Sequence, residues 1–471
     1  MVIVCFLINY IYMFYLMVVV FVLGYIMIAM EHSININKAA FALLIGTLLW
    51  TIYSLGADSI LSLGYSKNWN TFIGSGIGTH TDKINFITDH ELIENLGTIS
   101  STLFFLLGAM TIVDLIDRNG GFSIITNSIG STNLVRLMWV IGILAFIMSS
   151  LLDNLTTTII MLTMLSKIFE AKEYRWVYAS LVVIAANAGG AWSPIGDVTT
   201  IMLWIGGQVT SGPIISHLFF PSFSCMLVAT YLLARYVEGH RIPPVLESTE
   251  TEQINTRANE IFILILGCVA LISVPVFKYY TSLPPYVGML LGLAVLWIIT
   301  DRRSRKLKSK DRRKTTVNAA LHSIDVSTIL FFLGILSAVG ALESAGHLTL
   351  MSQWLTKYCP NIYATNTIIG VVSSIVDNVP LVAASMGMYN IEPANVLGGL
   401  HSFVVNGDFW NLLAYCAGTG GSLLIIGSAA GVAAMGLERI SFVWYFKNIS
   451  LVAFISYVVG IGVYFLQSLV F

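Results

Sequence analysis

Two Asp-Asn pairs stand inside long apolar segments of this 471-residue chain, at Asp153-Asn154 and at Asp377-Asn378. A carboxylate at membrane depth costs at least about 2.5–3.5 kcal/mol on insertion scales, so each pair needs a reason to be there. Hard cations prefer oxygen ligands, which aspartate, asparagine and unwound backbone supply. The pairs therefore predict a buried cation site. In the alternative that the sequence leaves open, each aspartate only caps a helix that begins beside it.

A third acid of this kind is Asp197, which follows the segment NAGGAWSPIG. The glycines and the proline of that segment disfavour a continuous helix. Non-helical backbone is tolerated at membrane depth only where it is buried in protein or lines a watery cavity. Asp197 is therefore a candidate for the same site, with capping of the next helix again as the alternative.

Neutral oxygens accompany the three acids. Their hydroxyls can coordinate an ion or bond back to their own helix, and the sequence does not decide between these roles. We expect a hard cation such as Na⁺ to bind at Asp153, Asn154, Asp197, Asp377 and Asn378, and protons to compete with it for the acids. The full set of predicted cation- and proton-binding residues is Asp153, Asn154, Thr156, Thr157, Asn187, Asp197, Thr199, Thr200, Asp377, Asn378, Ser422 and Ser428.

The elements that must hold these residues are membrane helices. Hydrophobic residues make up 56% of the chain and charged residues 10%, whereas soluble domains carry about 25% charged residues. The composition predicts an all-α polytopic membrane protein with about 11–13 transmembrane segments of about 20 residues each. The polar stretch 57–98 predicts a long external loop with room for a re-entrant or surface helix. Simple spans are expected at 1–30, 38–56, 99–117, 213–233, 259–278, 284–300, 326–345 and 441–468.

Four further apolar segments are interrupted in their middle, and the interruptions pair. SSLLDN at 149–154 matches SSIVDN at 373–378, with an offset of 224 residues. The glycine pair at 189–190 matches the pair at 420–421, with an offset of 231. Repeated features in the same order indicate an internal duplication. We therefore expect re-entrant hairpins at 134–168 and 362–391, and broken helices at 176–209 and 410–437.

The duplication, together with loop charge, gives a domain plan. Residues 301–314 hold nine of the 24 Lys and Arg, and a short basic loop marks the cytoplasmic side. Counting spans from this loop places the two hairpins in opposite orientations, which is the inverted-repeat plan of secondary transporters. The predicted parts are N-terminal scaffold spans and loop at 1–98, a first repeat at 99–235, linking spans and the basic loop at 236–325, and a second repeat with the last span at 326–471.

The blocks DNLTTT and NAGGAWSPIGDVTTIMLW, at 153–158 and 187–204, resemble the NhaD type of sodium/proton antiporter in the ion transporter superfamily. The blocks FFLLGAMTIVDLIDRNGGF, DNVP and GTGGSLLIIGSAAG extend the resemblance over residues 90–437. The resemblance implies a transport domain of two hairpins and two broken helices beside a scaffold that forms a homodimer. It also implies electrogenic exchange of Na⁺ or Li⁺ for H⁺ by an elevator-type movement.

Rival functions are a sodium-coupled dicarboxylate symporter or an oxyanion efflux permease of the same fold. The family resemblance implies Ser-Asn-Thr tips in the related symporters, whereas Asp153 and Asp377 stand at the tips here. Their charge disfavours an anionic substrate. An integral-membrane enzyme is the alternative of a different class, but no P-loop, HExxH or nucleophile elbow is evident. We expect no enzyme activity, no cofactor and no nucleic-acid partner, and we expect the lipid bilayer of a bacterial inner membrane as the location.

Overall fold

The computed structural model describes residues 2–34, 36–74, 78–122, 133–169, 171–237, 256–305, 315–375, 377–393 and 401–469. Regular structure in these ranges is helical, apart from one isolated bridge between Glu392 and Val404. The predicted all-α class is therefore confirmed. Most of the basic loop predicted at 301–314 lies outside the described residues.

Eight helices of the described chain are long and apolar enough to cross a membrane, as the composition predicts. Shorter apolar helices add to them, among them the segment Tyr12–Ile28 of α1 (Val2–Ala29). The expected span at 441–468 is divided at Ile449 into α24 (Phe442–Asn448) and α25. The long helices are α3 (Lys38–Leu55), the continuous segment His80–Arg118 that ends in α7 (Leu92–Arg118), α9 (Leu134–Leu152), α13 (Ser211–Val237), α14 (Arg257–Thr281), α15 (Pro285–Ser304), α18 (Val326–Ser344) and α25 (Ser450–Ser468).

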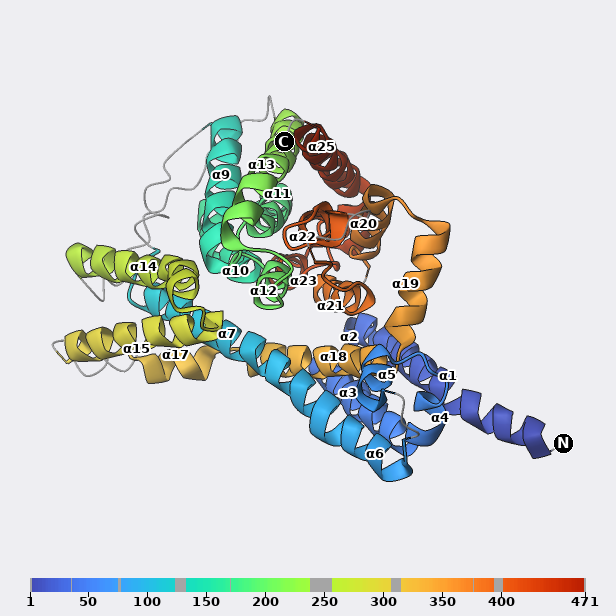
Figure 1. Cartoon of the computed structure of the whole chain (residues 1–471). Helices are drawn as coiled ribbons and strands as arrows, with labels where there is room; N and C mark the ends of the chain where they lie inside the picture. Colours follow the sequence, from blue (N-terminus) through green and yellow to red (C-terminus); the bar gives the residue numbers. More distant parts are fainter. Residues whose placement is uncertain are drawn as a thin grey trace. The chain divides into compact units, whose positions relative to one another are not determined.

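The chain forms two compact units, of which the first comprises Met1–Leu103, Asp325–Thr365 and Pro380–Ile391. Helices α3 and α18 pack together at its centre, and α1 packs on α3 (Figure 1). The two central helices approach closely at Gly46, where a Cβ would lie only 2.6 Å from the carbonyl oxygen of Gly334. Small residues at such crossings are typical of membrane helices.

The stretch 57–98, predicted as an external loop, is helical over most of its described length. It forms α4 (Ala57–Leu61), α5 (Lys67–Ile73), α6 (His80–Asn85) and a π-helical segment (Phe86–Glu91) that continues into α7. Thr79 and Asp82 form a capping box at the start of α6, which satisfies backbone N–H groups at that helix end. The prediction allowed a re-entrant or surface helix in this loop, and the structure has several short helices because the polar residues include helix caps and exposed helix faces.

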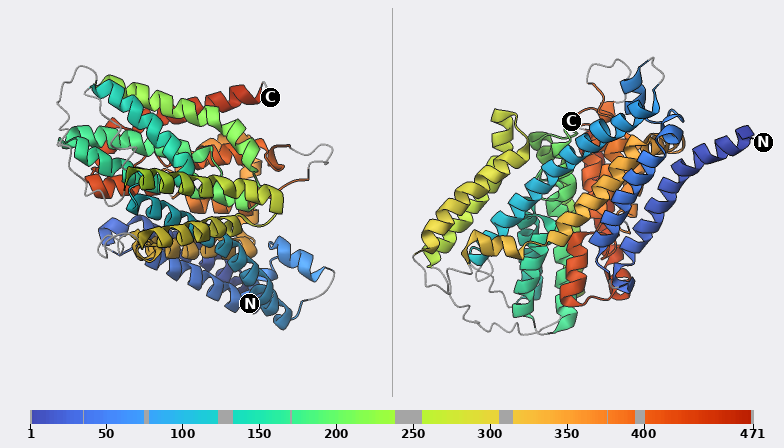
Figure 2. Two further views of the ribbon diagram at one scale, coloured as in Figure 1. Left: turned by 90° about the vertical axis from the view of Figure 1, so that its left-hand side faces the viewer. Right: turned by 90° about the horizontal axis from the view of Figure 1, so that it is seen from below.

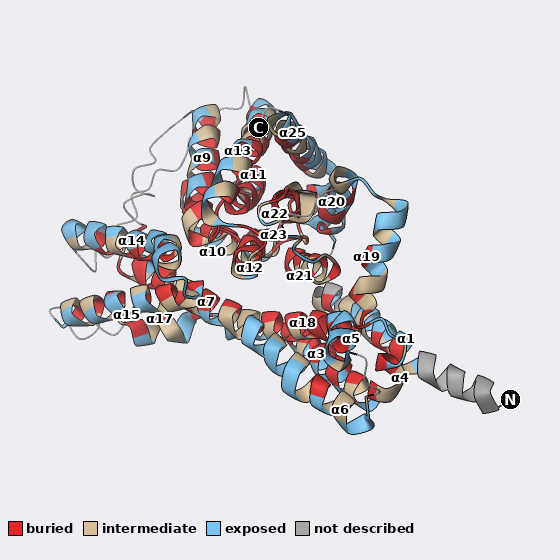
Figure 3. Ribbon diagram, in the orientation of Figure 1, coloured by how far each residue is buried: buried red, intermediate tan, exposed pale blue. Residues whose placement is uncertain are grey.

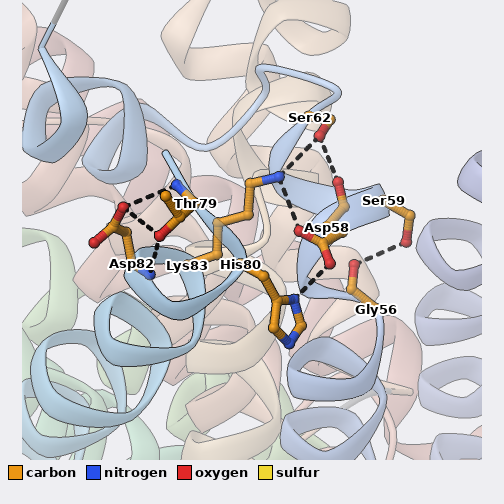
Figure 4. Close-up of polar contacts among 8 residues, drawn as sticks. All are labelled: Gly56, Asp58, Ser59, Ser62, Thr79, His80, Asp82 and Lys83. Atoms are coloured by element: carbon orange, nitrogen blue, oxygen red, sulfur yellow. Dashed lines mark hydrogen bonds and ion pairs between the residues drawn. The ribbon is translucent and has the colours of Figure 1, made fainter. Parts of the chain in front are cut away.

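Asp58 joins α4 to α6 (Figure 4). Its carboxylate oxygens lie 3.1 Å from Lys83 Nζ and 2.5 Å from His80 Nδ1. Partial burial opposes ionisation of Asp58, but the hydrogen bonds and charges of Lys83 and His80 outweigh it and hold the pKa of Asp58 below its usual value. The contact between the two short helices therefore depends on an ionised Asp58.

We expect Asp58→Asn to lower the free energy of unfolding by at most about 1 kcal/mol, because the Asp58 side chain is 48% exposed and solvent screens its charge. Since the folded state lowers the pKa of Asp58, this contribution is complete above the usual pKa of 3.8 and is lost as pH falls through the folded value. Thermal unfolding in detergent at neutral and acid pH checks this, with Asp89→Asn as the control. A difference between Asp58→Asn and the wild type that persisted in acid would contradict the assignment.

The second unit comprises Phe104–Ile324, Asn366–Val379 and Glu392–Phe471. It contains the predicted breaks. Asp153 alone separates α9 from α10 (Asn154–Ile168), and residues 192–197 separate α11 (Lys172–Ala191) from α12 (Val198–Ile205). Residues 421–428 separate α22 (Asp408–Gly420) from α23 (Ala429–Glu438). The second Asp-Asn pair stands between α20 (Ile362–Val372) and α21 (Asn378–Met388).

Serine contacts of the second unit recur at the predicted offsets. Ser149 Oγ donates to the carbonyl oxygen of Ala186 at 2.6 Å, and Ser373 Oγ donates to that of Ala417 at 2.9 Å. The two serines are 224 residues apart and the two acceptors are 231 apart, as in the sequence matches. Each serine fixes the end of a hairpin helix to a broken helix, so the same local design occurs twice.

Glycines recur in the same way. A Cβ on Gly189 would lie 2.2 Å from the carbonyl oxygen of Phe146, and one on Gly420 would lie 2.1 Å from that of Gly370. Each glycine therefore lets a broken helix contact the backbone of the first helix of its hairpin. These matched contacts support the internal duplication, while the predicted domain boundaries remain a prediction.

The broken helices are the most enclosed elements of the second unit. Every residue of α11 from Val177 to Ala191 is buried, as is every residue of α22 from Phe409 to Gly420 (Figure 3). By contrast, α14 and α15 lie side by side and expose large apolar side chains, which is typical of helices that face lipid (Figure 2). The predicted cation site thus lies on the elements that exclude solvent.

Candidate functional site

Asp153 occupies the single residue between α9 and α10, with φ of 101°. Positive φ is uncommon for a residue other than glycine and is found mostly where the surroundings enforce it. Its carboxylate accepts hydrogen bonds from Thr156 N at 2.7 Å and from Thr156 Oγ1 at 3.0 Å. Asp153 is therefore a helix cap, and its position at a turn between two apolar helices leaves an ion-binding role compatible with capping.

Asp197 caps the second half of the first broken helix. Its Oδ1 accepts from Thr199 N at 3.0 Å at the start of α12, and the residue is 1% exposed. A negative charge at a helix N-terminus is favourable. The capping alternative is thus correct for Asp197 as well, but it uses only one of the two carboxylate oxygens.

Asparagines of both hairpins meet at the second oxygen of Asp197. Asn154 Nδ2 donates to Asp197 Oδ2 at 3.0 Å, and Asn378 Nδ2 makes a long hydrogen bond to the same atom at 3.5 Å. The two asparagines come from the two Asp-Asn pairs that the sequence singles out. One carboxylate of the first repeat therefore contacts the tips of both hairpins.

Asn187 connects the two broken helices. Its Oδ1 accepts from Asn154 Nδ2 at 3.0 Å. Its Nδ2 donates to Ser422 Oγ at 2.8 Å and to Ser428 Oγ at 2.9 Å. Asn187 is fully buried, and the two serines lie in the break between α22 and α23. The residues of the two repeats thus form one polar network across the centre of the unit.

The network is rich in negative charge. Asp377 and Asp153 both lie within electrostatic range of Asp197. In the described ranges, no lysine, arginine or histidine forms an ion pair with Asp153 or Asp197. Buried charges need compensation, and no described group of three His, Cys, Asp or Glu side chains could hold a metal ion by itself. A cation here would therefore depend on amide, hydroxyl or backbone oxygens as well as on the acids.

The predicted threonines differ in what their hydroxyls do. Thr156 Oγ1 bonds to Asp153, and Thr200 Oγ1 donates to the backbone oxygen of Asp197 at 2.8 Å. The hydroxyl of Thr157 is fully buried and has no hydrogen-bond partner among the described residues, whereas that of Thr199 is buried beside the Asp197 carboxylate. A buried hydroxyl without a partner is costly, so Thr157 keeps an oxygen that an ion or a water can use.

Comparison with known proteins gives the family. The family described as "Citrate transporter" (CitMHS) matches residues 25–401. "Sodium/proton antiporter 1" of Arabidopsis thaliana is 44% identical over 95% of this chain and 71% of its own length. "Sodium/proton antiporter 2" of the same plant is 40% identical over 95% of this chain and 98% of its own. "Na(+)/H(+) antiporter NhaD" of Vibrio cholerae is 31% identical over 90% of this chain and 85% of its own.

The chain belongs to the NhaD family of sodium/proton antiporters. The resemblance inferred from the sequence blocks is therefore confirmed. The NhaD-like blocks at 153–158 and 187–204 form the N-terminal part of α10, the end of α11, the break and most of α12. These two blocks supply Asn154, Asn187 and Asp197, three of the five residues joined in the network, and the block at 418–431 supplies the other two, Ser422 and Ser428.

Some residues around this NhaD-type site were not predicted from the sequence. Gly418 is one, because a Cβ at this position would lie 3.6 Å from Asp197 Oδ2. The offset of 231 makes Gly418 the counterpart of Asn187, and this pairing was the signal that could have revealed it. Other intramembrane acids lie elsewhere: Asp114 pairs with Arg118, and Glu343 belongs to the first unit.

An ion pair also links the two repeats of this NhaD-family protein at the far ends of their broken helices. Arg175 Nε at the start of α11 lies 2.9 Å from Glu438 Oε2 at the end of α23. Trp176 Nε1 donates to the backbone oxygen of Glu438 at 3.0 Å. Glu438 is 6% exposed, so the ion pair is largely shielded from solvent.

We expect Glu438→Gln to lower the free energy of unfolding by about 1–3 kcal/mol, because Arg175 would lose its charged partner in a largely buried setting. Glu173→Gln, an exposed acid on the same helix as Arg175, is the matched control and is expected to change little. Thermal unfolding of the purified protein in detergent measures both. Equal stability of the two variants would show that the ion pair contributes nothing.

Proposed function

We propose that this protein is a secondary active transporter that exchanges Na⁺ or Li⁺ for H⁺ across a membrane. The observation that carries the proposal is that Asp153 and Asp377 lie within electrostatic range of Asp197, which is itself buried in a network of amides and hydroxyls. The names of the NhaD and Arabidopsis relatives describe the same exchange for those proteins.

Competition for the same acids explains how one site would serve both ions. Closely spaced buried carboxylates repel one another, and either a proton or a cation relieves that repulsion. Asp153 and Asp377 stand at the hairpin tips and would lose a proton as Na⁺ binds. Na⁺ would take its further oxygens from Asn154, Asn378 and the buried threonine hydroxyls. Because the ions exclude one another, each crossing of the membrane carries one kind and the result is exchange.

Reconstituted protein tests the proposal. In proteoliposomes with an imposed pH gradient, we expect added Na⁺ or Li⁺ to dissipate the gradient, as read with a pH-sensitive dye, and K⁺ to leave it unchanged. Three alternating additions to the same vesicles give the cation preference directly. Dissipation of the gradient by K⁺ at the same rate, or no dissipation by any of the three cations, would contradict the proposal.

A carboxylate substrate is the rival that the family description favours, since the matching family is described as a citrate transporter. A di- or trianion would have to approach Asp153 and Asp377 at the tips, and like charges in a buried site are costly. Uptake of labelled citrate or succinate in the presence of Na⁺ distinguishes the two, and we expect none. Arsenite sensitivity of cells that express the protein tests the oxyanion permease in the same way.

Finer points belong to the same proposal. Exchange is electrogenic and elevator-like, the protein is a homodimer, and no cofactor or enzyme activity is involved. The bacterial inner membrane is the proposed location; the alternative is an organellar membrane, which the Arabidopsis relatives favour. Cross-linking of the purified protein tests the dimer, and cell fractionation with an antibody tests the membrane.

A further inference from the structure

The three acids of the candidate site are not used alike in the structure. Asp153 accepts both of its described side-chain hydrogen bonds from Thr156, in the helix α10 that Asp153 caps. Asp197 instead accepts from three partners on three helices: Thr199 N, Asn154 Nδ2 and Asn378 Nδ2. A carboxylate with three donors on three helices fixes the orientation of those donors, including the two tip asparagines.

An amide side chain has two N–H hydrogens and one carbonyl oxygen, held in one plane. Asn154 Nδ2 donates both of its hydrogens, one to Asp197 Oδ2 and one to Asn187 Oδ1, each at 3.0 Å. Its carbonyl oxygen must then face away from Asp197, and no hydrogen bond among the described residues uses it. Asn378 also directs its nitrogen at Asp197. Both tip amides are thus oriented with nitrogen toward Asp197 and oxygen away from it.

The two repeats are unequal at this point. The counterparts of Asn187 and Asp197 at the offset of 231 are Gly418 and Ser428, which carry no charge and no amide. Ser428 accepts from Asn187 and caps α23 through Gly431 N at 3.2 Å. A single carboxylate therefore serves both hairpin tips, and Gly418 leaves space beside its Oδ2 atom.

We infer that Asp197 is a positioning residue: it holds Asn154 and Asn378 by their N–H groups and thereby presents their carbonyl oxygens to the transported cation. This inference rests on the proposed cation exchange. It gives Asp197 a role different from that of the tip acids, because Asp197 acts on the cation through the two amides. Its loss should weaken cation binding more than it slows the transport cycle.

Asp197→Asn tests the inference. Asparagine keeps one oxygen, so the side chain loses either the bond to Thr199 N or the bonds to both tip amides. In the proteoliposome assay we expect the apparent KM for Na⁺ to rise at least about tenfold while the maximal rate stays within about threefold of the wild type. Asp408→Asn, in the same unit but hydrogen-bonded to Tyr464 at 2.8 Å, is the matched acid-to-amide control.

A second variant acts on Asp197 without replacing it. Gly418→Ser places a hydroxyl near Asp197 Oδ2, where it competes with the tip amides, and is expected to raise the KM for Na⁺ as well. Gly418→Ala adds only a Cβ at ordinary contact distance and should raise it less. If Asp197→Asn does not fold, these two variants still decide the question.

The outcomes separate the inference from the proposed function. A wild type that shows no Na⁺-dependent gradient dissipation overturns the proposed function and the inference together. If the wild type exchanges normally but the KM of Asp197→Asn for Na⁺ is unchanged, the inference alone is overturned. This holds whether or not the maximal rate of the variant is lost. Equal KM values for Gly418→Ser and Gly418→Ala overturn it too.

Discussion

Asp153→Asn is expected to reduce sodium/proton exchange at least about 100-fold, equivalent to roughly 2.7 kcal/mol for the loss of a buried charge from the site. Asparagine is as good a helix cap as aspartate, and it tolerates positive φ. The bond from Thr156 N and the turn at φ of 101° therefore survive the substitution. What is lost is the charge and the exchangeable proton, so this variant separates ion binding from capping.

The measurement is the initial rate of gradient dissipation at saturating Na⁺ in proteoliposomes that contain equal amounts of folded protein. Asp301→Asn provides a control acid outside the network, where the carboxylate accepts from Trp297 Nε1 at 3.1 Å. We expect the control to retain the wild-type rate. An Asp153→Asn variant that exchanged at the wild-type rate would reduce Asp153 to a helix cap.

Gly420→Ala is expected to have the second large effect, on stability. A Cβ at this position would lie 2.1 Å from the backbone oxygen of Gly370, and backbone cannot give way as a side chain can. Overpacking usually costs about 1–3 kcal/mol, and a clash with backbone is at the upper end or beyond. The better helix propensity of alanine returns only about 1 kcal/mol. We therefore expect a clear loss of folded protein and a lower Tm.

Gly436→Ala is the matched control for this prediction. Gly436 lies in α23, the second half of the same broken helix, and nothing lies within 4 Å of a Cβ built there. Alanine should leave the Tm of this variant unchanged or raise it. Size-exclusion profiles of heated detergent samples compare the two variants. A Gly420→Ala protein as stable as Gly436→Ala would contradict the prediction, because it would mean that α22 can move away from α20 without loss of stability.

The helix breaks could be predicted because local chemistry sets them. Gly189, Gly196 and Pro194 interrupt a helix in any context, and a carboxylate such as Asp153 in an apolar run is conspicuous in any membrane protein. Apolar composition likewise placed most long spans to within a few residues, although the helix expected at 99–117 begins at His80 and the span expected at 441–468 is divided at Ile449. The repeat offsets then gave the pairing of hairpins and broken helices, which the contacts of Ser149 and Ser373 repeat in space.

The network itself could not be predicted, because it depends on packing between distant elements. Asn187 meets Ser422 and Ser428 only when the two repeats interlock, and the sequence gives no sign of which hydroxyls it contacts. The number of helices in the stretch 57–98 could not be predicted for a different reason: its polar residues satisfy helix ends, and composition alone does not distinguish a cap from a loop. Polar residues in membrane proteins therefore indicate where function lies more reliably than how it is arranged.

Proton release on Na⁺ binding tests the central claim most directly, because the claim is that one set of acids serves both ions. Purified protein in weakly buffered detergent solution is titrated with NaCl while a pH indicator is read. We predict a saturable release of protons that K⁺ does not cause and that Asp153→Asn abolishes, with an apparent Na⁺ affinity that weakens as pH falls. Saturable Na⁺ binding without proton release, and with the same affinity at every pH, would contradict the account.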